Sequence, residues 1–444
     1  MSPRPAIVAV VDGLTPAMLE AGMESGGAPT LAALAAHGRY GHATSTFPSL
    51  TPVCLSSIAT GAHPDVHEIP HLVWYRRSER RLVEYGSSFG AARANGLART
   101  LRDTLVRMNR DHLGRGAVTL FEALADAGLR TAAVNFTAYR GRSAHRAPFL
   151  GTVHGPEQFH FYNLFTTGRT GAPLSWRNRP AGTIDAYAAA VGRWLVTRDA
   201  FDVFVYYLSD FDYASHELGP DAAHEALARC DAALAALVEA AGGLDELLER
   251  YVLLVCSDHG QTRVEHVARL EEPLAGIEGA LVTASNRAGQ VYLLDGCRAD
   301  PREVAARLDG SAAVEVALFR EGGEAVARRE AEELRFAPAP GGGWSSRGDA
   351  AILDHPDALG RCWAALANPN AGDVLVSAAV GWELADLAGR HHRGGGSHGS
   401  LAAGDSTVPM LTVGLPTVPA SIVDVAPLVL AHFGVAAPQY ARAA

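Results

Sequence analysis

Acidic and imidazole side chains follow several apolar runs of this sequence, at positions suited to metal-binding chemistry. Ligands of open parallel sheets bind beyond the carboxyl ends of the strands, so a polar residue just after an apolar run is a candidate site residue. Carboxylates and imidazoles together are the ligands expected for zinc or a similar divalent ion. The candidate metal ligands are Asp12, Asp212, His216, Asp258, His259 and His398.

Each candidate has an ordinary alternative explanation. Asp12 precedes a glycine and could be a turn residue, and Asp258 could close a loop with its own side chain. His398 lies in a glycine-rich segment and could be a solvated loop histidine. Asp212 and His216 are more informative, because a spacing of four lets both meet one ion from a single helical turn. The joint placement of all these residues favours a metal site over unrelated turns.

A threonine followed by proline opens a predicted helix. Thr51 and Pro52 precede an apolar run that ends at Gly61, the pattern of an N-cap, a proline in the first turn and a glycine stop. Thr51 could therefore simply cap the helix. Alternatively, its hydroxyl is a nucleophile, placed where free backbone N–H groups and the helix dipole would stabilise a phosphoryl group and a forming alkoxide. Both roles use the same oxygen, and the sequence leaves both open.

Short apolar runs separated by alanine-rich helical patterns predict a mostly parallel sheet. Continuous apolar strands that alternate with helices are typical of sheets buried on both faces. Residues 221–241 predict a packing helix, with apolar residues recurring at spacings of three and four. The fold class is therefore α/β. The predicted strands are residues 6–11, 131–136, 203–208, 251–256 and 411–413.

The pattern changes between residues 277 and 387 to short alternating segments, such as 314–320, joined by Gly-Gly turns. This change predicts a small α+β insertion, or cap, in a larger domain made of residues 1–276 and 388–444. Residues 166–182 form a second loose stretch, rich in glycine, proline, arginine and threonine.

Length and composition exclude several classes of protein. With 444 residues, 48% of them hydrophobic, the chain can bury the core of a large α/β domain. A net charge of −10 disfavours binding to nucleic-acid polymers or anionic membranes. Five scattered cysteines without Cys-x-x-Cys spacing disfavour both a disulfide framework and a thiolate zinc site. We find no secretion signal or membrane-spanning run, and expect a cytoplasmic protein with a small anionic substrate.

The order and spacing of these segments resemble the type I phosphodiesterase and nucleotide pyrophosphatase branch of the alkaline phosphatase superfamily. Its pattern combines a strand with Asp-Gly, a threonine with Thr-Gly nine residues later, Asp-x-x-x-His, Ser-Asp-His-Gly and a late His-Gly. The resemblance extends from residue 6 to about residue 435, and the set of motifs is highly specific. The matching segments are Val11-Asp12-Gly13, Thr51 with Thr60-Gly61, Asp212 to His216 with Gly219-Pro220, Ser257-Asp258-His259-Gly260 and Ser397-His398-Gly399.

The resemblance implies an alkaline-phosphatase-like catalytic domain, in which a central, mostly parallel sheet lies between helix layers and carries the inserted cap. It also implies two divalent ions, expected to be zinc, and Thr51 as nucleophile. Thr46 has similar neighbours but lies five residues too early for the Thr-Gly spacing. By position, the first ion would be held by Asp212, His216 and His398, and the second by Asp12, Asp258, His259 and the Thr51 oxygen.

Substrate-binding residues are predicted less directly. The family generally has asparagine three residues after the nucleophile, where it can donate to a phosphoryl oxygen, whereas this chain has Cys54, and a thiol is a much weaker donor. Asn135, Arg140, Arg142 or a water molecule could replace that donor, although Arg142 is better explained as a solvated arginine. His71 and Tyr75 follow the nucleophile helix and could stack on a nucleobase.

The resemblance predicts metal-dependent hydrolysis of phosphodiester or pyrophosphate (nucleotide-type) bonds through a phospho-threonine intermediate. The nearest alternatives on the same two-zinc core are a phosphonoacetate-type phosphonate hydrolase and a phosphomonoesterase. A non-catalytic metal-binding homologue is disfavoured by the intact ligands. A manganese-dependent mutase is disfavoured because such enzymes typically use serine at the position of Thr51.

Overall fold

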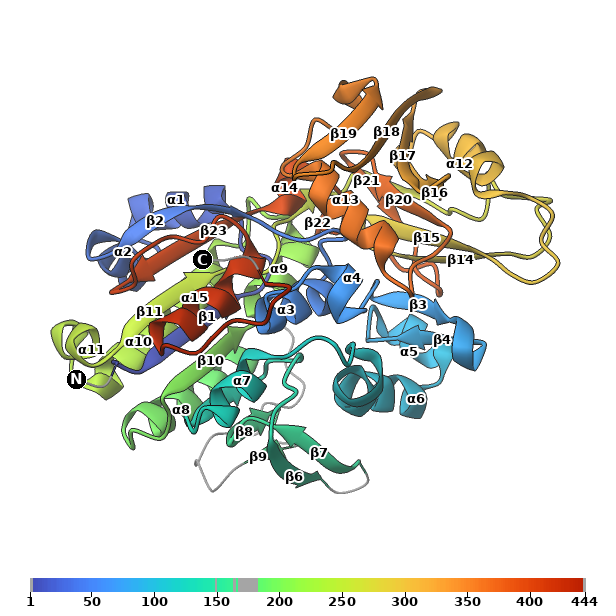
Figure 1. Ribbon diagram of the computed structural model, residues 1–444. Helices are drawn as coiled ribbons and strands as arrows, with labels where there is room; N and C mark the ends of the chain where they lie inside the picture. The colour runs from blue at the N-terminus through green and yellow to red at the C-terminus, as the bar shows by residue number, and fades with distance from the viewer. Residues whose placement is uncertain (1–2, 148–149, 163–164, 167–182, 442–444) are drawn as a thin grey trace.

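The structure is a computed structural model that describes residues 3–147, 150–162, 165–166 and 183–441. Residues 167–182, most of the loose stretch expected at 166–182, lie outside the described residues. Two sheets organise the chain, and the second is yellow to orange in Figure 1.

The first sheet has eight strands in the order β2-β23-β11-β1-β10-β5-β8-β9. Five neighbouring strands, from β11 to β8 in this order, are parallel, so the predicted mostly parallel sheet is confirmed. The last predicted strand, 411–413, begins earlier and pairs antiparallel with β11. The strands are β1 (Ala6–Val11), β2 (Arg39–Thr44), β5 (Thr131–Val134), β8 (Gln158–Phe161), β9 (Phe165–Thr166), β10 (Val203–Leu208), β11 (Val252–Cys256) and β23 (Thr407–Val413).

Helices cover both faces of this sheet (Figure 1). Successive residues of each strand point to opposite sides, so the apolar strands present apolar side chains on both faces, and the helices bury them. Val8 and Val10 of β1 pack into one hydrophobic cluster, and Ile7 and Val11 pack into the other. Burial on both faces explains why the strands are continuous apolar runs. The first cluster includes α3 (Thr51–Thr60), α7 (Leu120–Asp126) and α15 (Val425–His432), and the second includes α1 (Pro16–Ser25), α2 (Pro29–Ala36), α8 (Thr183–Val196) and α10 (His224–Ala241).

A second, seven-stranded antiparallel sheet forms between residues 280 and 378, in the order β14-β15-β20-β16-β17-β18-β19. Helices α12 (Pro301–Asp309) and α13 (Ala358–Ala367) pack into separate clusters with it. All these elements lie within residues 277–387, which we propose as the bounds of the cap. The strands are β14 (Ala280–Ser285), β15 (Ala288–Leu293), β16 (Val314–Glu321), β17 (Glu324–Arg329), β18 (Glu332–Pro338), β19 (Trp344–Gly348) and β20 (Val374–Ala378).

Two short ladders pair the chain that precedes the cap with the last residues of the cap and with the chain that follows it. β13 (His266–Ala268) pairs with β21 (Trp382–Leu384), and β12 (Thr262–Arg263) pairs with β22 (Gly396–Ser397). The entry and exit of the cap are therefore held close together. Among the described residues, no helix has both the length and the apolar character that a membrane span requires.

The remaining helices and strands form the connections. They are α4 (Pro64–His67), β3 (Val73–Arg76), β4 (Arg81–Glu84), α5 (Phe89–Asn95), α6 (Leu97–Arg102), a π-helix (Asp103–His112), β6 (Ser143–Ala147), β7 (Gly151–Gly155), α9 (Asp210–Leu218), α11 (Leu244–Arg250), α14 (Ala403–Ser406) and three short 3-10 helices (Arg77–Glu79, Ala350–Leu353 and Ile422–Asp424).

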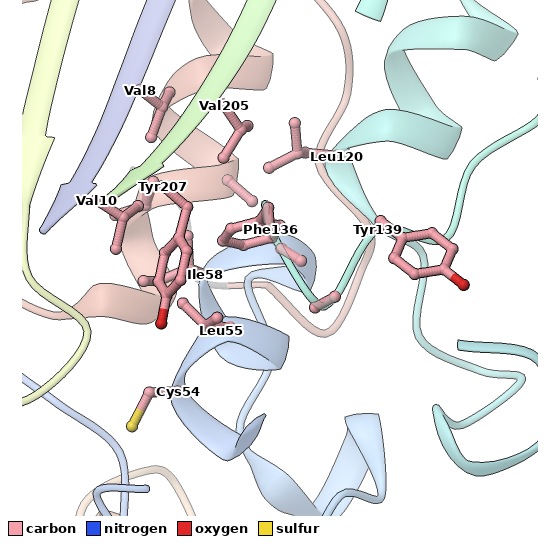
Figure 2. Packing of buried hydrophobic residues seen from close by; sticks show 14 of the residues in the cluster. Val8, Val10, Cys54, Leu55, Ile58, Leu120, Phe136, Tyr139, Val205 and Tyr207 are labelled. Atoms are coloured by element: carbon pink, nitrogen blue, oxygen red, sulfur yellow. The ribbon is translucent and has the colours of Figure 1, made fainter. Parts of the chain in front are cut away.

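Aromatic packing under α3 and α7 supports the carboxyl ends of the central strands. The Phe136 ring centroid lies 6.1 Å from that of Phe121 and 6.2 Å from that of Tyr207. Figure 2 shows Phe136 between Tyr207 and Leu120, while the Tyr207 hydroxyl and the Cys54 sulfur point out of the cluster. The apolar core therefore ends at the Tyr207 hydroxyl and the Cys54 sulfur.

We predict that Phe136→Ala lowers the free energy of unfolding by about 3–5 kcal/mol, because it removes a buried ring and leaves a cavity. The matched control is Phe89→Ala, since that ring is 68% exposed and its removal should change stability by less than about 0.5 kcal/mol. Urea unfolding of both variants tests this, and equal losses would contradict it.

Candidate metal centre

Six predicted ligands form two groups beyond the carboxyl ends of the central strands. In each group the ligand atoms lie within 4.8 Å of one another. The groups are Asp212, His216 and His398, and Asp12, Asp258 and His259.

Strand order explains why residues so distant in sequence meet. β1 lies between β10 and β11, so residues that follow three adjacent parallel strands emerge at one edge of the sheet. Asp12 follows β1, and Asp258 follows β11. Asp212 and His216 lie one turn apart on α9, after β10, with 3.4 Å between Oδ2 and Nε2.

A ladder outside the main sheet brings the two groups together. Thr262 pairs with Ser397, so the loops that carry His259 and His398 run side by side. The two imidazole rings stack with centroids 3.6 Å apart and an angle of 7° between their planes. The two groups therefore form one continuous centre.

Each histidine of the centre is oriented by a hydrogen bond from Nδ1 to a backbone carbonyl. Nδ1 lies 2.8 Å from Gly396 O in His216, 3.0 Å from Gly260 O in His259 and 2.7 Å from Ser49 O in His398. These bonds place the proton on Nδ1 and leave Nε2 as the ligand atom, the usual arrangement for a metal-binding histidine.

The carboxylates are crowded and buried. Burial, together with the charge of Asp212, raises the pKa of Asp12 and raises the pKa of Asp258 to about 7. Burial also opposes ionisation of Asp212, but its pKa is lowered because His216, His398 and His259 together outweigh that effect. Asp258 Oδ2 is buried and accepts no hydrogen bond from the described residues. Buried anionic oxygens beside imidazole nitrogens fit divalent cations, so the donor set suits metal binding.

Thr51 lies at this centre but does not cap its helix. Leu50 is the N-cap of α3, with extended backbone angles (φ −114°, ψ 137°), and Thr51 is the first helical residue. The capping interpretation is therefore wrong, because the chain turns one residue earlier than the Thr-Pro pattern indicates. The Thr51 hydroxyl instead lies 3.1 Å from His259 Nε2, at the N-terminus of α3, where the helix dipole adds positive potential.

Three site residues were missed in the sequence. Tyr207 donates a hydrogen bond to Asp12 Oδ2, and Gln261 Nε2 donates to Asp212 Oδ1 over 2.5 Å. The amide nitrogen Nδ2 of Asn286, a residue of the cap, lies 2.8 Å from His398 Nε2. Gln261 directly follows the Ser-Asp-His-Gly motif and could have been suspected. Tyr207 lies within an apolar run that predicts only a core strand.

Three residues predicted to bind substrate are engaged elsewhere. Cys54 is fully buried 3.2 Å from Ser45 Oγ, and burial raises the pKa of its thiol to about 12. Arg140 forms an ion pair of 3.0 Å with Glu122 and donates to backbone carbonyls. The Tyr75 ring packs against a cap tyrosine, with centroids 5.8 Å apart.

The other two predicted residues are also buried. His71 Nδ1 accepts a hydrogen bond from Val73 N over 3.1 Å, and burial lowers the pKa of the imidazole to about 4. Asn135 follows β5 with a positive φ of 56°, which ends the strand two residues before the predicted boundary at 136. Its Oδ1 accepts from Tyr162 N over 3.0 Å, and its Nδ2 has no partner among the described residues. Contacts of all five residues with substrate stay predictions.

Comparisons with known proteins agree with this arrangement. A family model described as type I phosphodiesterase / nucleotide pyrophosphatase matches residues 6–401. A search of curated proteins gives no match.

Two solved structures share the fold over almost the whole chain. Phosphonoacetate hydrolase from Sinorhizobium meliloti 1021, in complex with phosphonoformate, is 21% identical, with a TM-score of 0.66 over 98% of this chain and 96% of that chain. Murine ectonucleotide pyrophosphatase / phosphodiesterase 5 is 14% identical, with a TM-score of 0.62 over 98% and 96%. These similarities confirm the predicted alkaline-phosphatase-like fold.

We predict that Asp258→Asn stabilises the metal-free protein at about pH 8 and that this gain shrinks towards about pH 4.5. The pKa of Asp258 is about 7, above its ordinary value of 3.8. Between these values the folded state binds more protons than the unfolded state, so this group lowers stability as pH rises. Asparagine cannot ionise and removes that loss.

Thermal unfolding of chelator-treated wild type and variant at both pH values measures the difference. Added zinc should raise the melting temperature of wild type more than that of the variant, because the substitution removes a ligand. A variant that is destabilised equally at both pH values without metal would contradict the electrostatic explanation.

Proposed function

This chain belongs to the type I phosphodiesterase / nucleotide pyrophosphatase family of phosphoric ester hydrolases, and we propose that it cleaves phosphodiester or pyrophosphate bonds of nucleotide-type substrates through a phospho-threonine intermediate. The observation that carries this proposal is the position of Thr51, whose hydroxyl lies 3.1 Å from His259 Nε2 at the junction of the two ligand groups. An inactive threonine-to-alanine variant of the murine protein, in complex with AMP, supports a reactive threonine and a nucleotide ligand.

In the proposed reaction, Thr51 attacks phosphorus in line with the leaving oxygen. A bond forms between Thr51 Oγ1 and phosphorus while the bond to the leaving oxygen breaks, and water then cleaves the phospho-threonine. Pro52 has no N–H, and the N–H groups of Val53 and Cys54 donate to Leu50 O. The start of α3 would therefore favour the phosphoryl oxygens through the Thr51 N–H and the positive end of the helix dipole. Divalent ions held by the two ligand groups would lower the pKa of the Thr51 hydroxyl and offset the negative charge that develops on the oxygens.

We propose zinc as the metal and two as the number of ions. Mixed imidazole and carboxylate ligands suit zinc, and each group supplies three of them. We also propose a cytoplasmic location, because all five cysteines are free thiols, as expected in a reducing compartment. A small phosphate ester, rather than a polymer, is the proposed substrate.

A phosphonate with a carboxylate group is the second candidate substrate, favoured by the similarity to phosphonoacetate hydrolase. Such a substrate needs a cation for its carboxylate, and the chain contains no lysine. Two arginines that contact the segments around the centre, Arg287 and Arg361, donate to a carboxylate, backbone carbonyls and a serine hydroxyl. Because these two arginines are already engaged, we keep the diester as the first candidate.

We predict that the zinc-loaded protein hydrolyses a bis-aryl phosphate diester faster than the mono-aryl phosphate, and that Thr51→Ala lowers turnover by at least about 10³-fold because it removes the nucleophile. Thr46→Ala is the matched control, since the Thr46 hydroxyl donates to Cys54 Sγ over 3.6 Å and is not among the ligands. Release of aryl alcohol from each ester, and release of inorganic phosphate from phosphonoacetate as a third substrate, decide among the candidates.

Preferential cleavage of phosphonoacetate would replace the diester proposal with the phosphonate alternative. Full activity of Thr51→Ala, or loss of activity in Thr46→Ala alone, would show that the nucleophile is assigned to the wrong threonine.

A further inference from the structure

The β14–β15 hairpin of the cap carries a buried asparagine at its tip. Ser285 pairs with Ala288, so Asn286 and Arg287 form a two-residue turn. Asn286 has a φ of 57°, a left-handed conformation that asparagine adopts more readily than most residues. Its side chain is only 6% exposed, although hairpin tips usually face solvent. This tip is therefore inserted into the protein, against the metal centre.

Arg287 fixes the tip against the loops that carry the ligands. Its backbone N–H donates to His398 O over 2.8 Å, and its buried guanidinium forms an ion pair of 2.7 Å with Asp405. The Asp405 carboxylate also accepts from Ser400 N and from the Thr262 hydroxyl. The position of Asn286 is thus set by the same residues that hold the His259 and His398 loops.

The Asn286 amide points at the ligand atom of His398. Its Nδ2 lies 2.8 Å from His398 Nε2, and because Nδ1 donates to Ser49 O, Nε2 must accept from the amide. The Ser285 hydroxyl donates to Asn286 Oδ1 over 3.2 Å and holds the amide in this orientation. The N–H group therefore occupies the side of the imidazole on which a metal would bind.

We propose that Asn286 is a substrate-binding residue, whose amide N–H donates to an oxygen of the phosphoryl group or of the leaving group. A metal on His398 uses the Nε2 lone pair, and the amide N–H then needs another acceptor close by. An oxygen of a tetrahedral oxyanion beside that metal meets this need. This proposal rests on the proposed function. Asn286 would donate the hydrogen bond to the phosphoryl oxygen that the Cys54 thiol, a weak and buried donor, cannot supply.

Binding of orthovanadate to the zinc-loaded protein tests the proposal without requiring turnover. Asn286→Ala should weaken vanadate binding by about 10-fold or more and lower kcat/KM for the diester by about 10²-fold, as expected for one lost oxyanion donor. Zinc content should remain two ions per chain. Asn286→Asp, which keeps the turn preference but cannot donate, should lose at least as much binding.

Asn368→Ala is the matched control. Asn368 is a second buried cap asparagine, 4% exposed, whose Oδ1 accepts from Asn370 N over 2.8 Å. Its replacement should leave vanadate binding and zinc content unchanged. Melting temperatures of all three variants show whether the cap stays folded, and Asn286→Asp carries the test if the alanine variant does not fold.

Three results would overturn the proposal. Vanadate binding as in wild type by both Asn286 variants, or failure of wild type to bind vanadate, excludes the amide as an oxyanion donor. Loss of one zinc ion in Asn286→Ala would make Asn286 a metal ligand instead. If wild type binds vanadate through Asn286 but cleaves no diester, the proposed reaction fails while the binding role stands.

Discussion

Like-charge repulsion among three buried carboxylates governs much of the surrounding structure. Asp12, Asp212 and Asp258 follow adjacent parallel strands, and no rearrangement within the sheet can separate them. Partial compensation comes from His216, which lowers the pKa of Asp212, from the Tyr207 hydroxyl and from the Gln261 amide. Such burial of charge is costly unless cations are bound, so the fold retains electrostatic strain at the position where chemistry takes place.

The cap contributes to this centre as well as covering it. A buried ion pair such as Arg287 with Asp405 adds little net stability, because the desolvation of both groups offsets their attraction. It does impose one geometry, since either group left alone would be an unpaired buried charge. The main effect of the ion pair is thus to fix the position of the β14–β15 hairpin relative to the loops that carry His259 and His398.

Sequence patterns predicted the parts of the fold that depend on local chemistry. The apolar runs identified the central strands, and the ligand types and spacing identified the residues that form the two groups. The N-cap prediction for Thr51 failed because the Thr-Pro pattern fits either of two adjacent positions. Asn286 lies 112 residues from His398, and no local pattern marks it, because its environment is created only when the cap docks. The same limit applies to Arg140, whose carboxylate partner is visible only in the folded chain.

The paired strands at the base of the cap have an evolutionary consequence. Because β13 with β21 and β12 with β22 fix the entry and exit of the inserted chain, its length and content can vary at a closure cost that grows only logarithmically. The proposed metal ligands lie outside this interval, while Asn286 lies within it. Exchange of the inserted segment that kept the Arg287–Asp405 ion pair would therefore change which molecule is held while leaving the core loops in place, so that one hydrolytic core could acquire new specificities by recombination.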